Sequence, residues 1–292
     1  MKPIFIKNAS QLITIKNSSH APLIKQAMSN LEIIENGSVL IENGRIIAVG
    51  EDKELSIQYS ERLKEALVIN ASGKLVTPGL IDPHTHLIFA GSREQEFSMR
   101  LQGKTYMEIM EMGGGIHSTA TQTKNASSEE LFNTGYERLT QFLLHGVTTI
   151  EAKSGYGMEW ETERKQLEVM RYLNQQHVVD VVSTFMGAHA VPKQYKENPE
   201  HYVELVTKEM IPKVAELGLA EFNDVFCEKG VFTPKQAKRI LETGKDFGLR
   251  PKIHADEIEA YGGAELAAEL GAISADHLLK TSEIGIYLMA KR

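Results

Sequence analysis

After residue 78, apolar segments of strand length alternate with segments of helical periodicity, and this alternation constrains the fold more than any other feature. Helix starts are readable between the strands. Ser127 to Glu130 has the capping-box pattern, and Thr233 is followed by Pro234, a residue favoured in the first helical turn. Alternating strands and helices are typical of parallel βα units. The expected strands are residues 79–86, 147–153, 179–187, 221–227, 250–255 and 272–276.

Residues 1–75 have a different pattern, in which short apolar runs are separated by turn residues. In the stretch LIENGRIIAV, Asn43-Gly44 supplies the positive φ angles of a tight hairpin turn. We therefore expect a small β-sandwich-like domain over residues 1–75, without chemistry of its own, and a barrel over residues 76–292. The length of 292 residues suits one large α/β barrel with a small attachment.

The composition favours a small-molecule partner. The formal net charge of -7 argues against nucleic acid, and no apolar run approaches the ~18 residues that a membrane helix needs. Cys227 is the only cysteine, which excludes an internal disulfide and fits a reducing compartment. We expect a cytoplasmic protein that binds a small-molecule substrate, without nucleic-acid or membrane partners, and a homodimer is left open.

Polar side chains collect where the expected strands end. In PGLIDPHTHLIFAG, residues 78–91, His84 and His86 are two positions apart, so both side chains share one face of the strand. The full set is His84, His86, Lys153, Tyr156, His189, His254, Glu257 and His277. In a closed barrel all these strand ends meet at one mouth, whereas an open doubly wound sheet would spread them along an edge. The set therefore favours the (β/α)₈ barrel.

Three or four imidazoles at one mouth suit a divalent transition metal such as zinc, which keeps a position open for water. Water bound in this way ionises near neutral pH and can attack a carbonyl, so hydrolysis is the expected chemistry. Taken alone, a His-x-His pair is more often an ordinary polar pair at a strand end, and so is His254 in KIHADE. Their shared placement is what favours a metal site.

Five motifs in this order, PGLIDPHTHLIFAGSRE, EAKSGYG, GAHAVP, KIHADE and SADHL, resemble the amidohydrolase superfamily. Within it, the chain is similar to the enzymes that open the imidazolone ring in histidine degradation. The resemblance implies an amidohydrolase-type TIM barrel and metal-dependent hydrolysis of the cyclic amide of 4-imidazolone-5-propanoate to N-formimidoyl-L-glutamate. It implies one zinc or iron ion held by His84, His86 and His254, catalytic roles for Glu257 and His277, and substrate contacts from Arg93, Tyr156, His189 and Glu257.

The residue types fit these implied roles. Arg93 follows the histidine pair in a loop, where a guanidinium can hold a carboxylate by two parallel hydrogen bonds. Glu257 lies three residues after His254 and can carry a proton for the attacking water, with Asp256 as its rival. Lys153 could suggest a carboxylated lysine between two metals, but the resembled enzymes hold one metal. We therefore expect Lys153 to be structural or supporting.

The chain differs from the resembled family in one respect. The family has eight barrel strands, and an aspartate at the end of the eighth completes its metal site. Here the sequence stops at Arg292, inside a helix expected to follow the sixth strand. We therefore expect a fragment of a longer protein, truncated after the sixth strand and with little activity by itself.

Two other interpretations of the sequence remain. A related amidohydrolase, such as a guanine deaminase, would leave Arg93 without a carboxylate partner on a neutral purine. The other is a metal-binding protein without catalytic activity.

Overall fold

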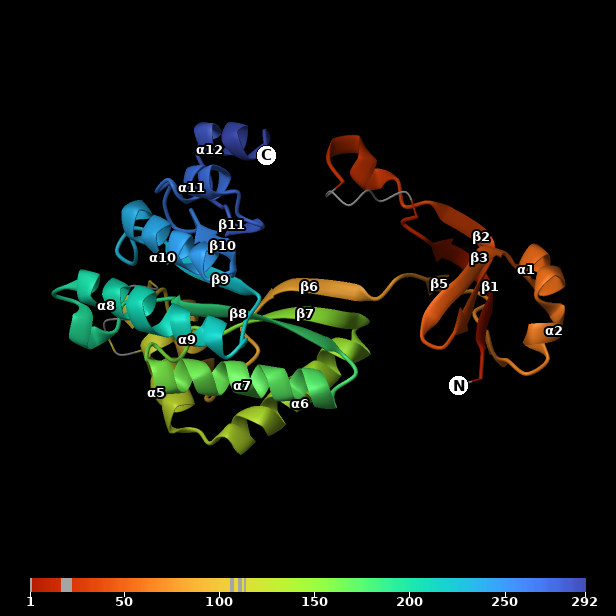
Figure 1. The fold of residues 1–292 in the computed structure, drawn as a ribbon, viewed down its shortest axis with the longest axis horizontal. Helices are drawn as coiled ribbons and strands as arrows, with labels where there is room; N and C mark the ends of the chain where they lie inside the picture. Colours follow the sequence, from red (N-terminus) through yellow and green to blue (C-terminus); the bar gives the residue numbers. More distant parts are fainter. Residues whose placement is uncertain (1, 17–22, 106–107, 110–111, 113) are drawn as a thin grey trace. The chain divides into compact units, whose positions relative to one another are not determined.

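The computed structural model describes residues 2–16, 23–105, 108–109, 112 and 114–292. The chain divides into two compact units, Met1–Gly79 and Leu80–Arg292 (Figure 1). The sequence placed this division after residue 75, and the structure places it after Gly79. Leu80 is also where the first strand of the larger unit begins.

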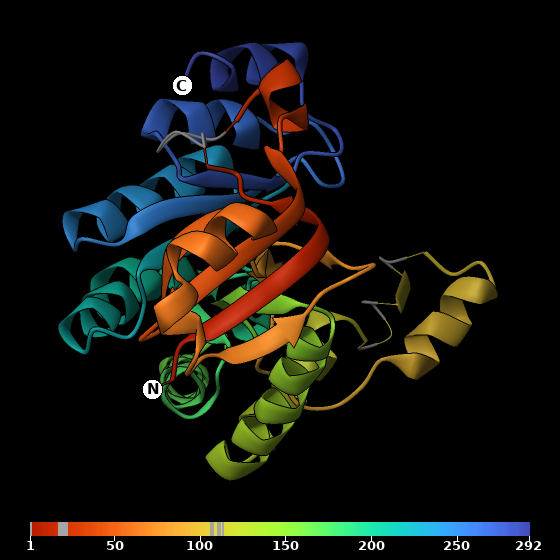
Figure 2. The same cartoon turned by 90° about the vertical axis from the view of Figure 1, so that its right-hand side faces the viewer.

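The smaller unit is one mixed sheet covered by short helices. Its strand order is β3-β2-β1-β4, with β5 also paired to β1. Asn43 and Gly44 have φ angles of 50° and 74°, so the expected hairpin turn joins β2 and β3. The helices α1 and α2 lie across one face of the sheet (Figure 2). The elements are β1 (Ile4–Ile13), η1 (Lys25–Ser29), β2 (Ile33–Glu42), β3 (Arg45–Glu51), α1 (Asp52–Gln58), α2 (Ser60–Leu63), β4 (Leu67–Asn70) and β5 (Leu75–Val76).

The larger unit is built on parallel strands in the order β11-β10-β9-β8-β7-β6, six in the described part of the chain. Each strand neighbours the next in sequence, as in a (β/α) barrel. The first and last strands approach each other: His84 Nδ1 of β6 lies 3.0 Å from Asp276 Oδ2 of β11. The strands are β6 (Leu80–Thr85), β7 (Val147–Lys153), β8 (Asp180–Ala188), β9 (Phe222–Cys227), β10 (Arg250–Ala255) and β11 (Ser274–His277).

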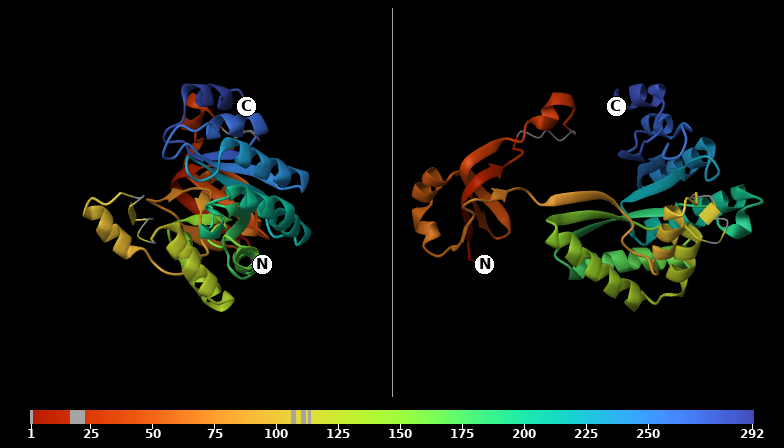
Figure 3. Two further views of the ribbon diagram at one scale, coloured as in Figure 1. Left: turned by 90° about the vertical axis from the view of Figure 1, so that its left-hand side faces the viewer. Right: turned by 180° about the vertical axis from the view of Figure 1, so that it is seen from behind.

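Helices cover the outside of these strands, with α6 and α7 along β7 and β8 (Figure 3). Ser127 caps α6 by a capping box, as its sequence predicts. Thr233 begins α10 ahead of Pro234, as expected, and it also forms a capping box. The elements are α3 (Glu94–Leu101), α5 (Ile116–Asn125), α6 (Ser128–Leu144), α7 (Trp160–Gln176), η2 (Lys193–Tyr195), α8 (Pro199–Leu205), the π-helical turn η3 (Val206–Met210), α9 (Ile211–Glu216), α10 (Pro234–Asp246), α11 (Gly263–Leu270) and α12 (Glu283–Met289).

Alternation along β7 separates the apolar core from the charged interior of the barrel. Ile150 and Ala152 are buried in the apolar cluster that also contains Leu139 of α6. Glu151 and Lys153 occupy the alternate positions, so their side chains point to the opposite face. Both are almost fully buried and paired with each other. The barrel interior therefore holds charge, while the layer between strands and helices is apolar.

The nearly closed parallel arrangement confirms the expected barrel and excludes the open doubly wound sheet. Helices α3 and α5 lie within the connection between β6 and α6, which also contains residues 106–107, 110–111 and 113 outside the described part. Within the described residues, no helix has the length and apolar character needed to cross a bilayer.

Candidate active site

One cavity of about 930 Å³ opens at the carboxyl ends of the barrel strands. Parallel strands bring their ends to one mouth, so residues far apart in sequence become neighbours there. All eight side chains for which the sequence suggested a role in binding or catalysis line this cavity: His84, His86, Arg93, Tyr156, His189, His254, Glu257 and His277. Phe226, Ile258 and Leu279 add apolar surface to it.

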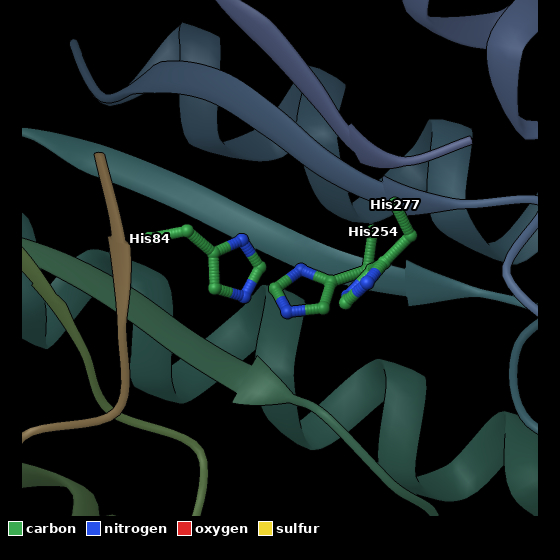
Figure 4. Close-up of side chains that lie close together, drawn as sticks. All are labelled: His84, His254 and His277. Atoms are coloured by element: carbon green, nitrogen blue, oxygen red, sulfur yellow. The ribbon is translucent and has the colours of Figure 1, made fainter. Parts of the chain in front are cut away.

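The histidine rings lie close together although they come from opposite sides of the barrel. His84 is at the end of β6 and His254 near the end of β10, and their ring centroids are 4.5 Å apart. His86 is 5.8 Å from His254. Figure 4 shows the rings of His84, His254 and His277 gathered together, with His277 5.0 Å from His254. His254 is therefore the central ring of the group.

Each of the three predicted ligands has its Nδ1 beside an oxygen acceptor. Nδ1 of His84 lies 3.0 Å from Asp276 Oδ2, Nδ1 of His86 lies 3.1 Å from the carbonyl oxygen of Ser154, and Nδ1 of His254 lies 3.1 Å from Asp224 Oδ1. Ionised carboxylates and carbonyls only accept hydrogen bonds, so the proton belongs on Nδ1. Each Nε2 then offers its lone pair.

The opposite nitrogens fit a metal. Nε2 of His86 and Nε2 of His254 are buried, and neither has a hydrogen-bond partner among the described residues. A buried nitrogen without a partner is costly, and metal-binding histidines typically donate their other N–H to a carboxylate or carbonyl. The donor set therefore suits a cation that prefers imidazole nitrogen.

The described part of the structure contains two groups of three histidines, and within each group the ring nitrogens lie within 4.8 Å of one another. Both groups include His254. One contains His84 and His277, and the other contains His86 and His189. The predicted ligand set of His84, His86 and His254 is not itself one of these groups, because it combines His254 with one histidine from each. The ligand atoms of a third group, Asp224, His254 and Asp276, also lie within 4.8 Å of one another. There, however, the Lys153 ammonium already neutralises the carboxylates, with Nζ 2.8 Å from Asp224 and 3.2 Å from Asp276.

Burial keeps the inner rings neutral. It lowers the pKa of His86 well below its usual value, and the neighbouring His189 and His254 lower it further. Burial also lowers the pKa of His189 to about 3 and the pKa of His277 below its ordinary value. The neutral imidazole is the form that binds metal, so these rings need not lose a proton first at neutral pH.

Arg93 and Tyr156 form the cationic side of the cavity. The guanidinium of Arg93 lies 5.8 Å from the centre of the Tyr156 ring, and its Nε donates to Thr119 Oγ1 at 2.8 Å. Burial raises the pKa of Tyr156, so the phenol keeps its proton. A fixed guanidinium beside a phenol O–H can hold a carboxylate.

Of the two candidate carboxylates after β10, only Glu257 faces the cavity. Glu257 Oε2 lies 3.8 Å from His277 Nε2. Asp256 is buried, and its two oxygens accept hydrogen bonds from the backbone N–H groups of Gly263 and Ala264 at the start of α11. Asp256 is therefore a structural residue, which leaves Glu257 as the carboxylate able to reach a substrate.

Sequence reasoning missed Glu163, which holds the loop that carries Tyr156. The buried carboxylate of Glu163 accepts hydrogen bonds from the backbone N–H groups of Gly155, Gly157 and Met158, at 2.7 to 3.0 Å. A Cβ at Gly157 would lie 2.5 Å from the Glu163 backbone nitrogen, so only glycine fits this contact. The one available signal was an acidic residue in the first turn of α7, which usually indicates only a favourable helix start.

We expect Glu163→Gln to displace Tyr156, because the amide NH₂ would face backbone N–H donors. The free energy of unfolding should fall by about 1–3 kcal/mol, the usual cost of leaving a buried donor unsatisfied. KM should rise while metal content stays unchanged. Glu161→Gln on the same helix, whose side chain is exposed and pairs with Arg164, is the matched control. Wild-type KM and thermal stability in Glu163→Gln would contradict the assignment.

Comparison with known proteins gives a consistent result. A model of the amidohydrolase family matches residues 67–124. The chain is 65% identical over 292 residues to an imidazolonepropionase of Geobacillus sp. (strain WCH70), covering all of this chain and 69% of that protein. It is 62% identical over 290 residues to an imidazolonepropionase of Brevibacillus brevis, covering 99% of this chain and 68% of that one.

Solved structures share the fold at low sequence identity. A guanine deaminase from C. acetobutylicum superposes with a TM-score of 0.62 at 12% identity, over 99% of this chain and 65% of the deaminase. An ochratoxinase from A. niger gives 0.61 at 16% identity, over 99% of this chain and 63% of the other. These likenesses establish the barrel architecture and leave the substrate to be argued from the site.

Proposed function

This chain belongs to the imidazolonepropionase family of amidohydrolases, and from that premise we propose that it hydrolyses the cyclic amide of 4-imidazolone-5-propanoate to N-formimidoyl-L-glutamate, a step of histidine degradation. One observation carries the proposal: a cluster of imidazoles and an arginine–tyrosine pair line the same cavity. The imidazoles suit hydrolysis at a metal, and the cationic pair suits a substrate that carries a carboxylate.

We propose that His84, His86 and His254 would hold one zinc or iron ion, since imidazole suits either metal. When bound, the ion supplies a Lewis acid that polarises a carbonyl and lowers the pKa of water. His84 and His86 lie at the end of β6 and His254 lies on β10, four strands away in the sheet, so the ligand set forms only in the folded barrel. Metal binding should therefore stabilise the fold.

Glu257 and His277 are the groups that we assign to proton transfer. Water adds to the ring carbonyl carbon, a new C–O bond forms, and the ring C–N bond then breaks. The Glu257 carboxylate accepts the proton from the water and returns it to the departing nitrogen. His277, whose Nε2 lies 3.8 Å from Glu257, can donate a hydrogen bond to the oxygen that becomes negative.

Arg93 and Tyr156 would bind the propanoate tail, and His189 would contact the imidazolone ring. The rings of His189 and His86 are stacked at 4.5 Å with an angle of 6° between their planes. Both rings line the cavity, so a flat heterocycle bound there can pack against them. The tail would then lie toward Arg93, on the side of the cavity formed by the segment after β6.

We expect Arg93→Ala to raise KM more than it lowers kcat, because a carboxylate clamp away from the reacting carbonyl acts on binding. Loss of the ion pair should cost about 2–5 kcal/mol, or roughly a thirtyfold or larger rise in KM. The assay follows the decrease in ultraviolet absorbance as protein of natural length consumes the imidazolone, corrected for the spontaneous decay of the substrate. Arg250→Ala, which removes an exposed pair with Glu221, is the control. An unchanged KM would remove Arg93 from the site.

We also propose that the protein acts in the cytoplasm. Its single cysteine, Cys227, is buried, and burial raises the pKa of its thiol to about 12. A buried, protonated thiol is unreactive and suits a reducing compartment. The proposed partner is the small-molecule substrate, and neither nucleic acid nor a membrane is part of the proposal.

A further inference from the structure

A fully buried ammonium group lies among the carboxylates beside the histidine cluster. Lys153 Nζ, at the end of β7, is 2.7 Å from Glu151 Oε1, 2.8 Å from Asp224 Oδ2 and 3.2 Å from Asp276 Oδ2. Burial opposes the charge, but the three carboxylates outweigh it and raise the pKa of Lys153 above its ordinary value. The lysine is therefore a fixed cation. Carboxylation to a metal-bridging group would need the neutral amine.

Two of these carboxylates also accept hydrogen bonds from the predicted metal ligands. Asp224 Oδ1 lies 3.1 Å from His254 Nδ1, and Asp276 Oδ2 lies 3.0 Å from His84 Nδ1. The ammonium thus links two carboxylate–histidine pairs whose histidines come from β6 and β10. Each of these two carboxylates therefore lies between the Lys153 ammonium and an imidazole N–H.

We propose that Lys153 is a positioning residue for the metal, which fixes the Nε2 atoms of His84 and His254 by holding Asp224 and Asp276 as acceptors for their Nδ1–H groups. The inference rests on the proposed metal site. Without the ammonium, the buried carboxylates of Glu151 and Asp224 and the partly buried carboxylate of Asp276 would repel one another. The oxygens of Asp224 and Asp276 would then turn away from the histidines. Loss of such outer partners typically weakens metal binding by about 10–100-fold.

The chain offers a matched control. Lys252, on strand β10, is also buried and pairs with Glu151, but no contact joins it to Asp224 or Asp276 among the described residues. Removing either lysine takes one buried charge from the same interior. Only Lys153 touches the carboxylates that orient the histidines. If loss of a buried charge alone weakened zinc binding, the Lys153 and Lys252 variants would both show it. If Lys153 positions the histidines, only the Lys153 variant would show it.

The test is a zinc titration of metal-free protein in competition with a chromogenic chelator. We expect Lys153→Met to bind zinc about 10–100-fold more weakly than wild type, with Lys252→Met within about threefold, although both lose thermal stability. Equal affinities in Lys153→Met and wild type, or equal losses in both variants, would overturn the inference. A gain of a second zinc ion in Lys153→Met would also overturn it, since Lys153 would then only fill a cation site. Failure of wild type to bind zinc would instead reject the proposed metal site.

A charge-balanced variant covers the case in which Lys153→Met does not fold. Lys153→Met/Asp276→Asn removes one charge of each sign from the network and is compared with Asp276→Asn alone. The double variant should bind zinc more weakly than Asp276→Asn, because the Asp224–His254 pair also loses its support. Equal zinc affinities in these two variants would contradict the role of Lys153.

Discussion

The His84→Ala/His86→Ala variant is expected to lose its metal. Nε2 of His86 is buried and lacks a hydrogen-bond partner within the described residues, and the His84 ring centroid is 4.5 Å from that of His254. One remaining histidine of the predicted set cannot provide the three protein ligands typical of a catalytic zinc site. Metal content after dialysis should fall from about one ion per chain to below about a tenth. Elemental analysis by mass spectrometry measures it.

The control for this variant is His145→Ala/His201→Ala, which replaces two histidines outside the cavity. The control should keep wild-type metal content. Retention of metal at the original stoichiometry by the His84→Ala/His86→Ala protein would rule out the predicted ligand set.

Glu257→Gln should lower kcat by about 10²–10⁴-fold while metal content and thermal stability stay close to wild type. The amide keeps the size of the side chain but cannot accept a proton. Because Glu257 lines the cavity and is partly exposed, its replacement leaves no buried charge without a partner. The measurement is steady-state turnover of the imidazolone by protein of natural length.

Glu259→Gln is the matched control for the kinetic effect. Glu259 lies two residues further along the same loop and pairs with Lys229 at the surface. We expect its kcat to remain within about twofold of wild type, as for surface substitutions in general. A kcat for Glu257→Gln within threefold of wild type would assign the proton transfer to another residue.

Local patterns in the sequence were sufficient to predict the barrel strands. The β7 and β10 segments match the predicted residues 147–153 and 250–255, and a glycine with positive φ, Gly146 or Gly248, lies shortly before each. Ser127 begins α6 as predicted, since the capping box is a purely local signal. The short helices α1 and α2 were not predicted, because neither has the length that gives a helical period.

The network that surrounds the histidines could not be predicted in this way. His84 and Asp276 are 192 positions apart in the sequence, and Lys153 and Asp224 are 71 apart. Closure of the barrel makes both contacts, and no local pattern specifies which acid faces which histidine. Asp276 lies within the SADHL motif, but the sequence analysis assigned a role in that motif only to its neighbour His277. The local sequence around Asp224 shows only a polar residue in a strand that is otherwise largely buried, so it does not indicate a contact with His254.

The most direct test of the proposed hydrolysis is the mass of the product formed in ¹⁸O-labelled water. Protein of natural length, loaded with zinc or iron, is incubated with 4-imidazolone-5-propanoate, and the products are analysed by mass spectrometry. We predict N-formimidoyl-L-glutamate that carries one ¹⁸O in the new carboxylate and keeps both ring nitrogens, with turnover lost on metal removal and restored on metal addition. Release of ammonia, or metal-loaded protein that leaves the substrate to decay at its spontaneous rate, would contradict the account.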